Sequence, residues 1–247
     1  MLELVVHMTD DSTLCYKRVM LKLSGEVLQG PSQGGVDGAT LRSMCADVKK
    51  LTDAGIKVAM VIGGGNFWRF RDQQELGFDR VLSDNMGMIA TVMNAMAFQE
   101  ALTNMGVRAK AFSALPMPSV LETYTPRGAR SAFADYDVVI CSGGTGNPYF
   151  TTDSAAALRA LELKCEVMLK ATKVDYVCDK DPKKFPDAQT YTTLTYTQVL
   201  EMGLEVMDLA AVAIAREGKL PIVVFNMQTP GNLEKVARGE NIGTTIS

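Results

Sequence analysis

Short apolar segments alternate with segments of helical spacing along most of the chain, and this alternation limits the possible folds more than any other feature. The apolar runs lie at residues 18–23, 56–62, 107–112, 136–140, 167–171 and 220–225. Most are apolar on both faces, which is typical of buried parallel strands. Helical patterns are expected at residues 37–54, 83–105, 155–163, 196–202, 208–216 and 232–238. The sequence therefore predicts an α/β fold, with a largely parallel sheet and helices on both of its faces.

The composition indicates a globular chain and argues against two classes of partner. The chain has 247 residues, of which 47% are hydrophobic and 21% charged, which suits one large α/β domain or two small ones. The formal net charge of -3 gives no bulk attraction to nucleic acid or to an acidic membrane surface. No apolar run approaches the length of a membrane span, and no signal peptide is predicted. We therefore expect a cytoplasmic protein with no nucleic-acid and no membrane partner.

Cysteine and histidine content limits the chemistry further. The cysteines are Cys15, Cys45, Cys141, Cys165 and Cys178. They form no C-x-x-C motif and are odd in number, so we expect reduced thiols. The single histidine, His7, precedes the first predicted strand, which argues against histidine acid–base chemistry and histidine metal ligands. Any metal is expected to be a hard cation such as Mg²⁺, held partly by a substrate's phosphates.

Capping residues and glycines predict where several helices begin and end. The helix at 37–54 has one apolar face and Gly55 as its stop. The helix at 83–105 is expected to start with Ser83 or Asp84 as its N-cap, and it is apolar on several sides, which predicts burial in a core or a subunit interface. Segments 116–128 and 171–188 are expected to be irregular, and 67–78 to be an exposed helix or a lid. Residues 1–15 are expected to form a loose tail before one domain, 16–247.

The segment CSGGTGNPYFTTDS, residues 141–154, joins an apolar strand to a predicted helix. Ligands of open α/β sheets bind at such strand ends. Its glycines let the backbone approach a ligand closely, and the free amides of the following helix favour an anion. A glycine pair alone is more often an ordinary turn. The nearby polar side chains of Thr145, Asn147, Thr151 and Thr152 instead favour a site for a base, a sugar or a phosphate.

Two other strand ends carry residues suited to phosphate. KLSG, residues 22–25, places Lys22 and backbone amides after the first strand. GGGN, residues 63–66, follows the second strand and can form a nest for an anion, with Arg69 placed to fork onto a phosphate. Asp153, at the end of the 141–154 segment, and Lys170, in the apolar run 167–171, add further charge. Lys22, Arg69 and Asp153 together favour phosphoryl transfer, because charge is neutralised on both sides of a moving phosphoryl group.

The residues by themselves leave two classes of protein open. One is a phosphotransferase, and the other is a nucleotide-binding sensor without turnover. Neither G-x-x-x-x-G-K-[ST] nor G-x-G-x-x-G occurs in the chain, so the usual P-loop and dinucleotide fingerprints are absent.

Several segments taken together resemble the bacterial UMP kinases of the amino-acid-kinase superfamily. The matching strings are KLSGE, VIGGGN with its downstream arginine, SDNMGMIATVMNA, GTGNPYFTTDSAA, LKATKVD, DKDP, VMDLAA and VFNM. The resemblance implies a three-layer α/β/α sandwich with a mainly parallel central sheet, in which the N-terminal part binds the acceptor and a C-terminal lobe binds ATP. It also implies transfer of the γ-phosphate of ATP to UMP, giving UDP and ADP in pyrimidine nucleotide biosynthesis, with Mg²⁺, by a cytoplasmic homohexamer.

The resemblance also assigns roles to residues by position. Lys22, Asp153 and Lys170 match the charged residues that organise transfer. ATP is expected to contact Lys22, Leu23, Ser24, Gly25, Gly65, Arg69, Thr172, Cys178 and Asp181. UMP is expected to contact Gly64, Asp84, Thr145, Gly146, Asn147, Pro148, Tyr149, Phe150, Thr151 and Thr152.

The mechanism implied by this resemblance needs no general base, because the phosphate of UMP is already an ionised nucleophile near neutral pH. Catalysis then consists of positioning and of charge neutralisation by Lys22, Lys170, Mg²⁺ and loop amides. The runner-up is a superfamily member that phosphorylates a carboxylate or a carbamate, and the PYFTTD string argues against it. A sensor without turnover is the third alternative.

Three places depart from the pattern of these kinases. Phe70 follows Arg69 where glycine is frequent, which predicts a bulkier loop. Cys178 stands where an aromatic residue packs near adenine, and Tyr176 stands where glycine is usual. Since residues two apart in an extended segment point to the same side, the Tyr176 ring is expected to cover part of the space beside Cys178. Many relatives are activated by GTP, but the matching helix positions, Gln99 and Thr103, lack the expected charge, which argues against GTP regulation.

Overall fold

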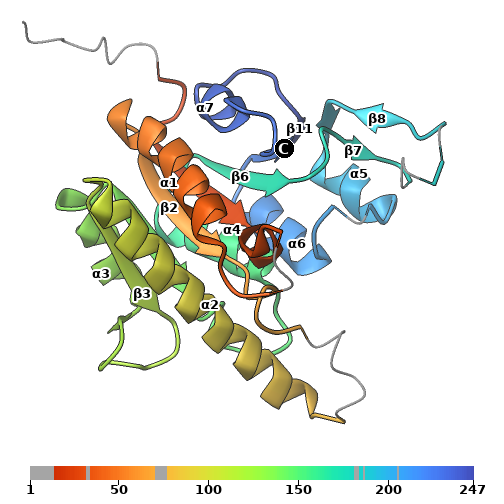
Figure 1. Ribbon diagram of the computed structural model, residues 1–247. Coiled ribbons are helices and arrows are strands. Elements are labelled where there is room, and N and C mark those ends of the chain that lie inside the picture. The colour runs from red at the N-terminus through yellow and green to blue at the C-terminus, as the bar shows by residue number, and fades with distance from the viewer. Residues whose placement is uncertain (1–13, 32–33, 70–76, 181–183, 186, 205) are drawn as a thin grey trace, which may run out of the picture.

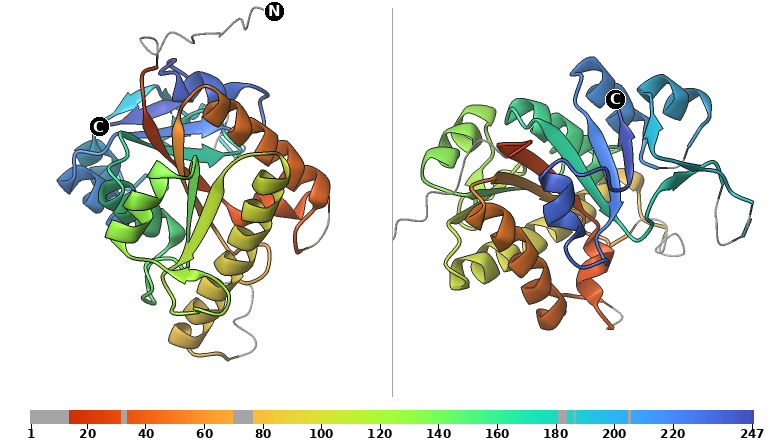
Figure 2. Two further views of the ribbon diagram at one scale, coloured as in Figure 1. Left: turned by 90° about the vertical axis from the view of Figure 1, so that its left-hand side faces the viewer. Right: turned by 90° about the horizontal axis from the view of Figure 1, so that it is seen from above.

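The computed structural model describes residues 14–31, 34–69, 77–180, 184–185, 187–204 and 206–247. Within them a central sheet lies between two layers of helices (Figures 1 and 2). The strands are β1 Arg18–Leu23, β2 Lys57–Ile62, β3 Ala109–Ser113, β4 Glu122–Thr123, β5 Val138–Ser142, β6 Val167–Thr172, β7 Val177–Cys178, β8 Thr190–Tyr191, β9 Thr193–Leu194, β10 Ile222–Asn226 and β11 Thr244–Ile246. The helices are the 3-10 turns η2 Gly25–Gln29 and η4 Ala132–Ala134, with α1 Gly38–Asp53, α2 Arg80–Asn104, α3 Pro126–Ser131, α4 Thr152–Glu162, α5 Tyr196–Glu201, α6 Leu209–Glu217 and α7 Asn232–Ala237. Most of the expected tail, together with Phe70 and Asp181, lies outside the described residues.

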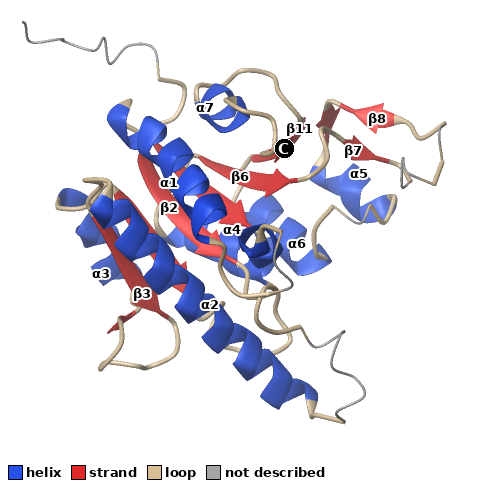
Figure 3. Ribbon diagram, viewed as in Figure 1, coloured by secondary structure: helices blue, strands red, loops and turns tan. Residues whose placement is uncertain are grey.

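In the described part of the chain, nine strands form one sheet in the order β4-β3-β5-β2-β1-β6-β10-β11-β9. Neighbours run parallel except β10 and β11, which are antiparallel. The prediction of a mainly parallel sheet is therefore confirmed. The remaining pair, β7 and β8, forms a separate antiparallel hairpin beside the main sheet (Figure 3).

The two helical layers enclose two separate apolar cores. On one face, α1, α2 and α7 cover the sheet, and on the other face α3, α4, α5 and α6 cover it. The side chains of β1 alternate between these cores, with Leu21 and Leu23 in the first and Met20 in the second. This alternation turns Lys22 toward α4, because successive side chains of a strand point to opposite faces. The three-layer α/β/α sandwich expected from the resemblance is thus the observed fold.

Helix α1 follows its sequence pattern closely. The Asp37 carboxylate accepts a hydrogen bond from the Thr40 amide at 2.7 Å and caps the helix. Gly55, just after the helix, has a φ of +87°, a conformation that glycine adopts without strain. Both predicted ends of this helix are confirmed.

The predicted start of helix α2 is wrong. The N-cap is Asp79, whose carboxylate accepts from the amides of Val81 and Leu82 at 2.9 and 3.3 Å, and neither Ser83 nor Asp84 caps the helix. The sequence pattern missed the first turn because Val81 and Leu82 are exposed and add nothing to a buried face.

Two segments expected to be irregular contain short regular elements. Residues 116–128 include β4 and the start of α3, whose cap is Thr125 followed by Pro126 at the first helical turn. Residues 171–188 include β7, one arm of the hairpin. Two-residue strands leave no periodic signal, because their pairing comes from partners distant in the sequence. None of the described helices is long and apolar enough to span a membrane.

Candidate phosphoryl-transfer site

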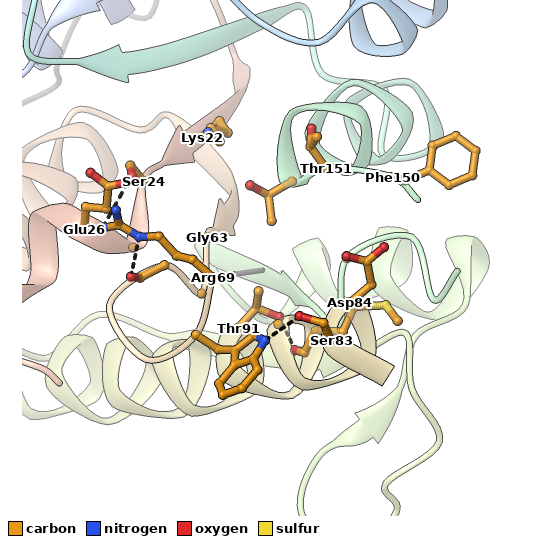
Figure 4. Close-up of a pocket in the computed structure, with 18 of the residues that line it drawn as sticks. Lys22, Ser24, Glu26, Gly63, Arg69, Ser83, Asp84, Thr91, Phe150 and Thr151 are labelled. Carbon is orange, nitrogen blue, oxygen red and sulfur yellow. Dashed lines mark hydrogen bonds and ion pairs between the residues drawn. The ribbon is translucent and has the colours of Figure 1, made fainter. Parts of the chain in front are cut away.

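A cavity of about 440 Å³ lies at the carboxyl ends of β1, β2 and β5, between the starts of α2 and α4. Figure 4 shows Lys22, Ser24, Glu26 and Arg69 around one part of it, with Asp84, Phe150 and Thr151 across the gap. Its lining is Lys22, Ser24, Gly25, Glu26, Gly63, Gly64, Gly65, Trp68, Arg69, Arg80, Ser83, Asp84, Gly87, Met88, Thr91, Gly144, Asn147, Phe150, Thr151 and Thr152. The three strand-end loops singled out in the sequence therefore meet in one cavity, as the parallel sheet requires.

Three buried charges form the floor beside this cavity. Lys22 of β1 is the register partner of Lys170 on the neighbouring strand β6, so both ammonium groups rise from the same face of the sheet. Asp153, in the first turn of α4, pairs with both: Lys22 Nζ lies 2.6 Å from Oδ1, and Lys170 Nζ donates to Oδ2. Each of the three is less than 10% exposed. The cluster carries one net positive charge, and Lys22 also faces the cavity, so it is suited to attract phosphate.

The protonation behaviour of the cluster follows from burial and mutual charge. Burial raises the pKa of the Asp153 carboxyl, but the opposing effects of Lys22 and Lys170 are larger together and hold that pKa below its ordinary value. Burial lowers the pKa of Lys170, and Lys22 lowers it further, while Asp153 acts in the opposite direction. Asp153 is therefore an anion at neutral pH that orients two cations and has no proton to exchange.

The KLSG and GGGN loops pack so closely that glycine is required at two points. A Cβ atom on Gly25 would lie 2.3 Å from the Gly63 carbonyl oxygen, and one on Gly64 would lie 2.6 Å from the Gly87 carbonyl oxygen. These contacts press the KLSG loop onto the GGGN loop, and the GGGN loop onto α2. Since real Cβ atoms do not approach backbone so closely, any larger residue at Gly25 or Gly64 would separate the loops.

Arg69 is anchored at the edge of the cavity. Its Nε donates to the Gly65 carbonyl at 2.8 Å, and its Nη2 forms an ion pair with Glu26 at 3.1 Å (Figure 4). Glu26 belongs to the KLSGE string but received no role from the sequence. The guanidinium is thus fixed beside the glycine loop, in a position to form a fork with a phosphate.

The loop between β5 and α4 is held from behind by buried side chains. Gly143, Gly144 and Gly146 all have positive φ angles, which glycine tolerates. The Gly143 amide donates to Thr91 Oγ1 of α2 at 2.8 Å. Arg159 of α4, which is 6% exposed, donates to the Gly144 carbonyl at 3.3 Å and pairs with Glu162 at 2.7 Å. Arg159 belongs to none of the motifs that predicted the site, although a lone arginine in an alanine-rich helix is a signal of a specific contact.

Asp84, the residue matched to UMP binding, lies in the first turns of α2 at the far wall of the cavity. Its carboxylate accepts from Arg80 Nε at 2.8 Å and from the Tyr149 amide at 2.8 Å. Tyr149 has a φ of +69°, an uncommon conformation for a residue with a side chain. Asp84 therefore holds the backbone of the loop that is expected to receive the nucleoside. In this loop the side chains of Tyr149 and Phe150 are 67% and 50% exposed.

The start of α4 has a second acid that the sequence analysis did not assign. Thr151 caps the helix by accepting from the Asp153 amide at 3.0 Å. Asp208, the N-cap of α6, accepts from the hydroxyls of Thr151 and Ser154, the latter at 2.7 Å. Asp208 lies in the VMDLAA string, and only the folded chain shows that it ties the starts of two helices together.

Three of the predicted ATP contacts, Leu23, Thr172 and Cys178, lie outside the lining of the main cavity. Leu23 is 1% exposed and packs in the α1–α2 core. Together with Thr172 it lines a second cavity of about 340 Å³, between the end of the sheet and α1. Cys178 lies on β7 of the separate hairpin, with Tyr176 37% exposed beside it.

The predicted residues therefore separate into three groups. Those that line the main cavity are Lys22, Ser24, Gly25, Gly64, Gly65, Arg69, Asp84, Asn147, Phe150, Thr151 and Thr152. Those that lie behind it or beside its loops are Asp153, Lys170, Thr145, Gly146, Pro148 and Tyr149. Those that lie in other parts of the fold are Leu23 and Thr172, at the second cavity, and Cys178, on the hairpin.

Metal-binding capacity among the described residues is limited. No group of three His, Cys, Asp or Glu side chains within them is arranged to hold a metal ion. The carboxylates nearest the phosphate loops, Asp153 and Glu26, are engaged by Lys22, Lys170 and Arg69. This donor set fits a cation held chiefly by the oxygens of a bound nucleotide.

Comparison with known proteins gives consistent matches over nearly the whole chain. The model of the amino acid kinase family matches residues 17–226. A uridylate kinase of Rickettsia bellii is 49% identical over 235 residues, covering 95% of this chain and 98% of the relative. A uridylate kinase of Escherichia coli K12 is 51% identical over 232 residues, covering 94% and 96%.

Solved structures agree with these sequence matches. A UMP kinase from Bacillus anthracis superimposes with a TM-score of 0.91 at 35% identity, covering 94% of this chain and 96% of that one. A uridylate kinase from Archaeoglobus fulgidus gives a TM-score of 0.74 at 30% identity, covering 93% and 99%. The fold and the site thus define a member of the amino acid kinase family. Within that family, the chain belongs with the uridylate kinases, as its sequence motifs predicted.

Proposed function

We propose that this chain is a UMP kinase, which transfers the γ-phosphate of ATP to UMP and releases UDP and ADP in pyrimidine nucleotide biosynthesis. Uridylate kinases that match it at about half of all positions over nearly its full length support this activity. The observation that carries the mechanism is the buried Lys22–Asp153–Lys170 cluster beside a glycine-lined cavity. Such a cluster suits phosphoryl transfer, where catalysis is mainly positioning and stabilisation of charge.

In this mechanism the phosphates of both substrates meet above Lys22. Lys22 and the amides around Gly25 and Gly65 contact the transferring group, while Arg69 forks onto phosphate at the cavity edge. Asp153 contacts neither substrate phosphate directly and keeps both ammonium groups in place. Lys170 stabilises the charge that develops on the donor.

Mg²⁺ is the divalent ion we propose, bound with ATP. It supplies charge neutralisation on the donor phosphates when present. Because Asp153 and Glu26 are already paired with cations, the protein contributes few direct ligands, and the ion enters with the nucleotide.

The acceptor end of the cavity suits a nucleoside monophosphate. The expected UMP contacts extend from Asp84 on α2 to the loop that ends at Thr152 on α4. Asn147, Phe150 and Thr151 of that loop line the cavity and offer polar groups and an aromatic ring for a base and a ribose. A carboxylate or carbamate acceptor, the runner-up, needs no such extended loop.

We also propose a cytoplasmic homohexamer. Helix α2 has a buried side, which carries Val92, Phe98 and Leu102. Its side chains Ile89, Met93 and Met96 are instead each more than 40% exposed. An exposed apolar stripe on a long helix supports packing against a second copy of the chain. Light scattering at micromolar concentration is expected to report six subunits, and a monomer refutes the assembly.

The activity is tested by a coupled assay that follows ADP release with UMP, CMP, glutamate or aspartate as acceptor. We expect turnover with UMP and Mg²⁺, and far slower turnover with each of the other three acceptors. Turnover with glutamate or aspartate but not with UMP favours the runner-up. Nucleotide binding without turnover on any acceptor favours the sensor.

A further inference from the structure

Two asparagines of the sequence motifs, Asn66 of VIGGGN and Asn94 of SDNMGMIATVMNA, received no role in binding or transfer. They meet in the interior, where Asn66 is 4% exposed and Asn94 is fully buried. Asn66 Nδ2 donates to Asn94 Oδ1 at 2.9 Å, and Asn94 Nδ2 donates to Asn66 Oδ1 at 2.8 Å. Their amides therefore form a closed, reciprocal pair between the phosphate loop and helix α2.

The second hydrogen of each amide is also used, and it extends the pair to two further points of the backbone. Asn94 Nδ2 donates to the Gly63 carbonyl at 2.7 Å, and Asn66 Nδ2 donates to the Gly35 carbonyl at 2.8 Å. The backbone of Asn66 accepts in turn from the Gly35 amide at 3.1 Å. All four amide hydrogens are thus satisfied, as buried polar groups require.

The KLSG loop rests directly on this pair. A Cβ atom on Gly25 would lie 2.7 Å from Asn66 Oδ1 and 2.3 Å from the Gly63 carbonyl oxygen. The position of Gly25, and with it the amides that follow Lys22, is therefore set by Asn66 and Gly63. Because Gly25 packs directly against both residues, a shift of Asn66 or Gly63 also displaces the backbone of Gly25.

Helix α2 supports the acceptor loop with the same face. Thr91 stands three residues before Asn94, so the two side chains are neighbours on the helix surface. Thr91 Oγ1 accepts from the Gly143 amide at 2.8 Å, while Asn94 holds Gly63. One rigid helix thus holds both the GGGN loop, whose Gly64 and Gly65 are expected to contact UMP and ATP, and the loop between β5 and α4, which is expected to receive UMP.

We infer that Asn66 and Asn94 are a positioning pair for phosphoryl transfer, which fixes the Gly63–Gly65 backbone and the KLSG loop relative to the acceptor loop. This inference rests on the proposed function. The pair contacts neither substrate, and it acts by keeping the reacting phosphates aligned. Because transfer rates fall steeply with small misplacements of the reacting atoms, loss of the pair reduces the rate of transfer more than it weakens substrate binding.

The test compares the wild type with Asn94→Ala, Asn66→Ala and the double variant, each at saturating UMP, ATP and Mg²⁺ and well below the Tm of every protein. Each single variant is expected to lose kcat by about tenfold to a hundredfold, with KM for UMP within about threefold of wild type. The double variant is expected to match the single variants, because the two amides act as a unit. Asn104→Ala is the matched control, since Asn104 lies on the same helix, is exposed and donates to Glu100 Oε1 at 3.4 Å.

A folded Asn94→Ala protein with kcat within twofold of wild type overturns the inference. So does a double variant whose loss equals the product of the two single losses. If Asn94→Ala does not fold, Asn94→Ser replaces it, because a serine hydroxyl can bond to a carbonyl of its own helix, and the same loss of kcat is expected. A lower Tm with unchanged kcat identifies a purely structural role. Failure of the proposed function is seen separately, as absent UDP formation by the wild type.

Discussion

The transfer centre and the region expected to bind the donor base are built in different ways. Lys22 and Lys170 rise from paired central strands, and Asp153 meets them from a buried helix turn, so all three are fixed by the core. Cys178 lies on a short hairpin outside the main sheet and is half-buried, and Tyr176, just before this hairpin, is 37% exposed. Lys22 and Lys170, which are expected to act on the phosphoryl group, are thus positioned by the register of two central strands. Tyr176 and Cys178, which are expected to lie near the base, instead depend on a peripheral segment.

Burial explains why the transfer centre needs all three charges. An ion removed from water is costly unless it is paired, and removal of one partner leaves an uncompensated charge. Asp153 offsets two cations, so the cluster keeps one positive charge for substrate without exposing its other groups to water. The hairpin has no such constraint, and substitutions there are expected to change affinity for ATP with little effect on the chemical step.

The largest expected effect is at Lys22. Lys22→Ala removes a preorganised charge from the transfer centre, and kcat is expected to fall by about 10²- to 10³-fold while the circular dichroism spectrum stays native. Lys49→Ala is the control, because Lys49 is a surface lysine that pairs with Asp53 at 2.7 Å. Near-normal kcat in the purified Lys22→Ala protein would remove Lys22 from the mechanism and with it the contrast between the two regions.

Arg69 is the next test, at the edge of the main cavity. Its guanidinium is expected to fork onto phosphate, and a charged hydrogen-bonding group of this kind contributes about 1.5–3 kcal/mol. Arg69→Ala should therefore lower kcat/KM for UMP by about tenfold to a hundredfold. Steady-state kinetics with varied UMP measures this, with Arg238→Ala, an exposed arginine paired with Glu234, as control. An unchanged kcat/KM would make Arg69 a surface residue only.

A smaller and different effect is expected on the hairpin. If the Tyr176 ring covers the space beside Cys178, its removal costs about 1–3 kcal/mol of stacking with the base. Tyr176→Ala is then expected to raise KM for ATP about tenfold with KM for UMP little changed, and Cys178→Tyr to lower KM for ATP. An ATP affinity that is insensitive to Tyr176→Ala would mean that the adenine site is simply less enclosed here.

The smallest effect concerns thiol reactivity. Burial raises the pKa of Cys45 and of Cys141 to about 12, so neither forms much thiolate at pH 8. Cys178 is only half-buried, and its pKa is raised less, chiefly by partial burial. Alkylation followed by mass spectrometry should therefore modify Cys178 before Cys45 and Cys141, and ATP but not UMP should slow it several-fold. Equal protection by UMP would argue that the hairpin does not belong to the donor region.

The parts of the fold that follow from the sequence are those that a local pattern of residues determines. The apolar run from residue 18 to 23 predicts β1, and Asp37 with Gly55 marks both ends of α1. The sequence identified all three glycine loops as strand-end sites, and they meet because parallel strands end at one edge of a sheet. These features depend on neighbouring residues and on one general rule of topology.

The remaining features depend on contacts between distant segments, which no local pattern records. Lys22 and Lys170 become neighbours only through the pairing of β1 with β6. The pairing of Asp208 with Thr151 and Ser154 joins helices α4 and α6. The strand β11 is three residues long and forms by pairing with β10, so it leaves no periodicity in the sequence.

The measurement that tests the central contrast most directly is the single-turnover rate of UDP formation, recorded by rapid quench at saturating ATP, UMP and Mg²⁺. Asp153→Asn removes the anion that orients Lys22 and Lys170, and its rate is expected to fall about a hundredfold or more. Tyr176→Ala lacks the ring expected to cover the base, but with its nucleotide site saturated it is expected to react at the wild-type rate. A wild-type rate for Asp153→Asn, or an equally reduced rate in both variants, would contradict the separation of transfer from donor-base binding.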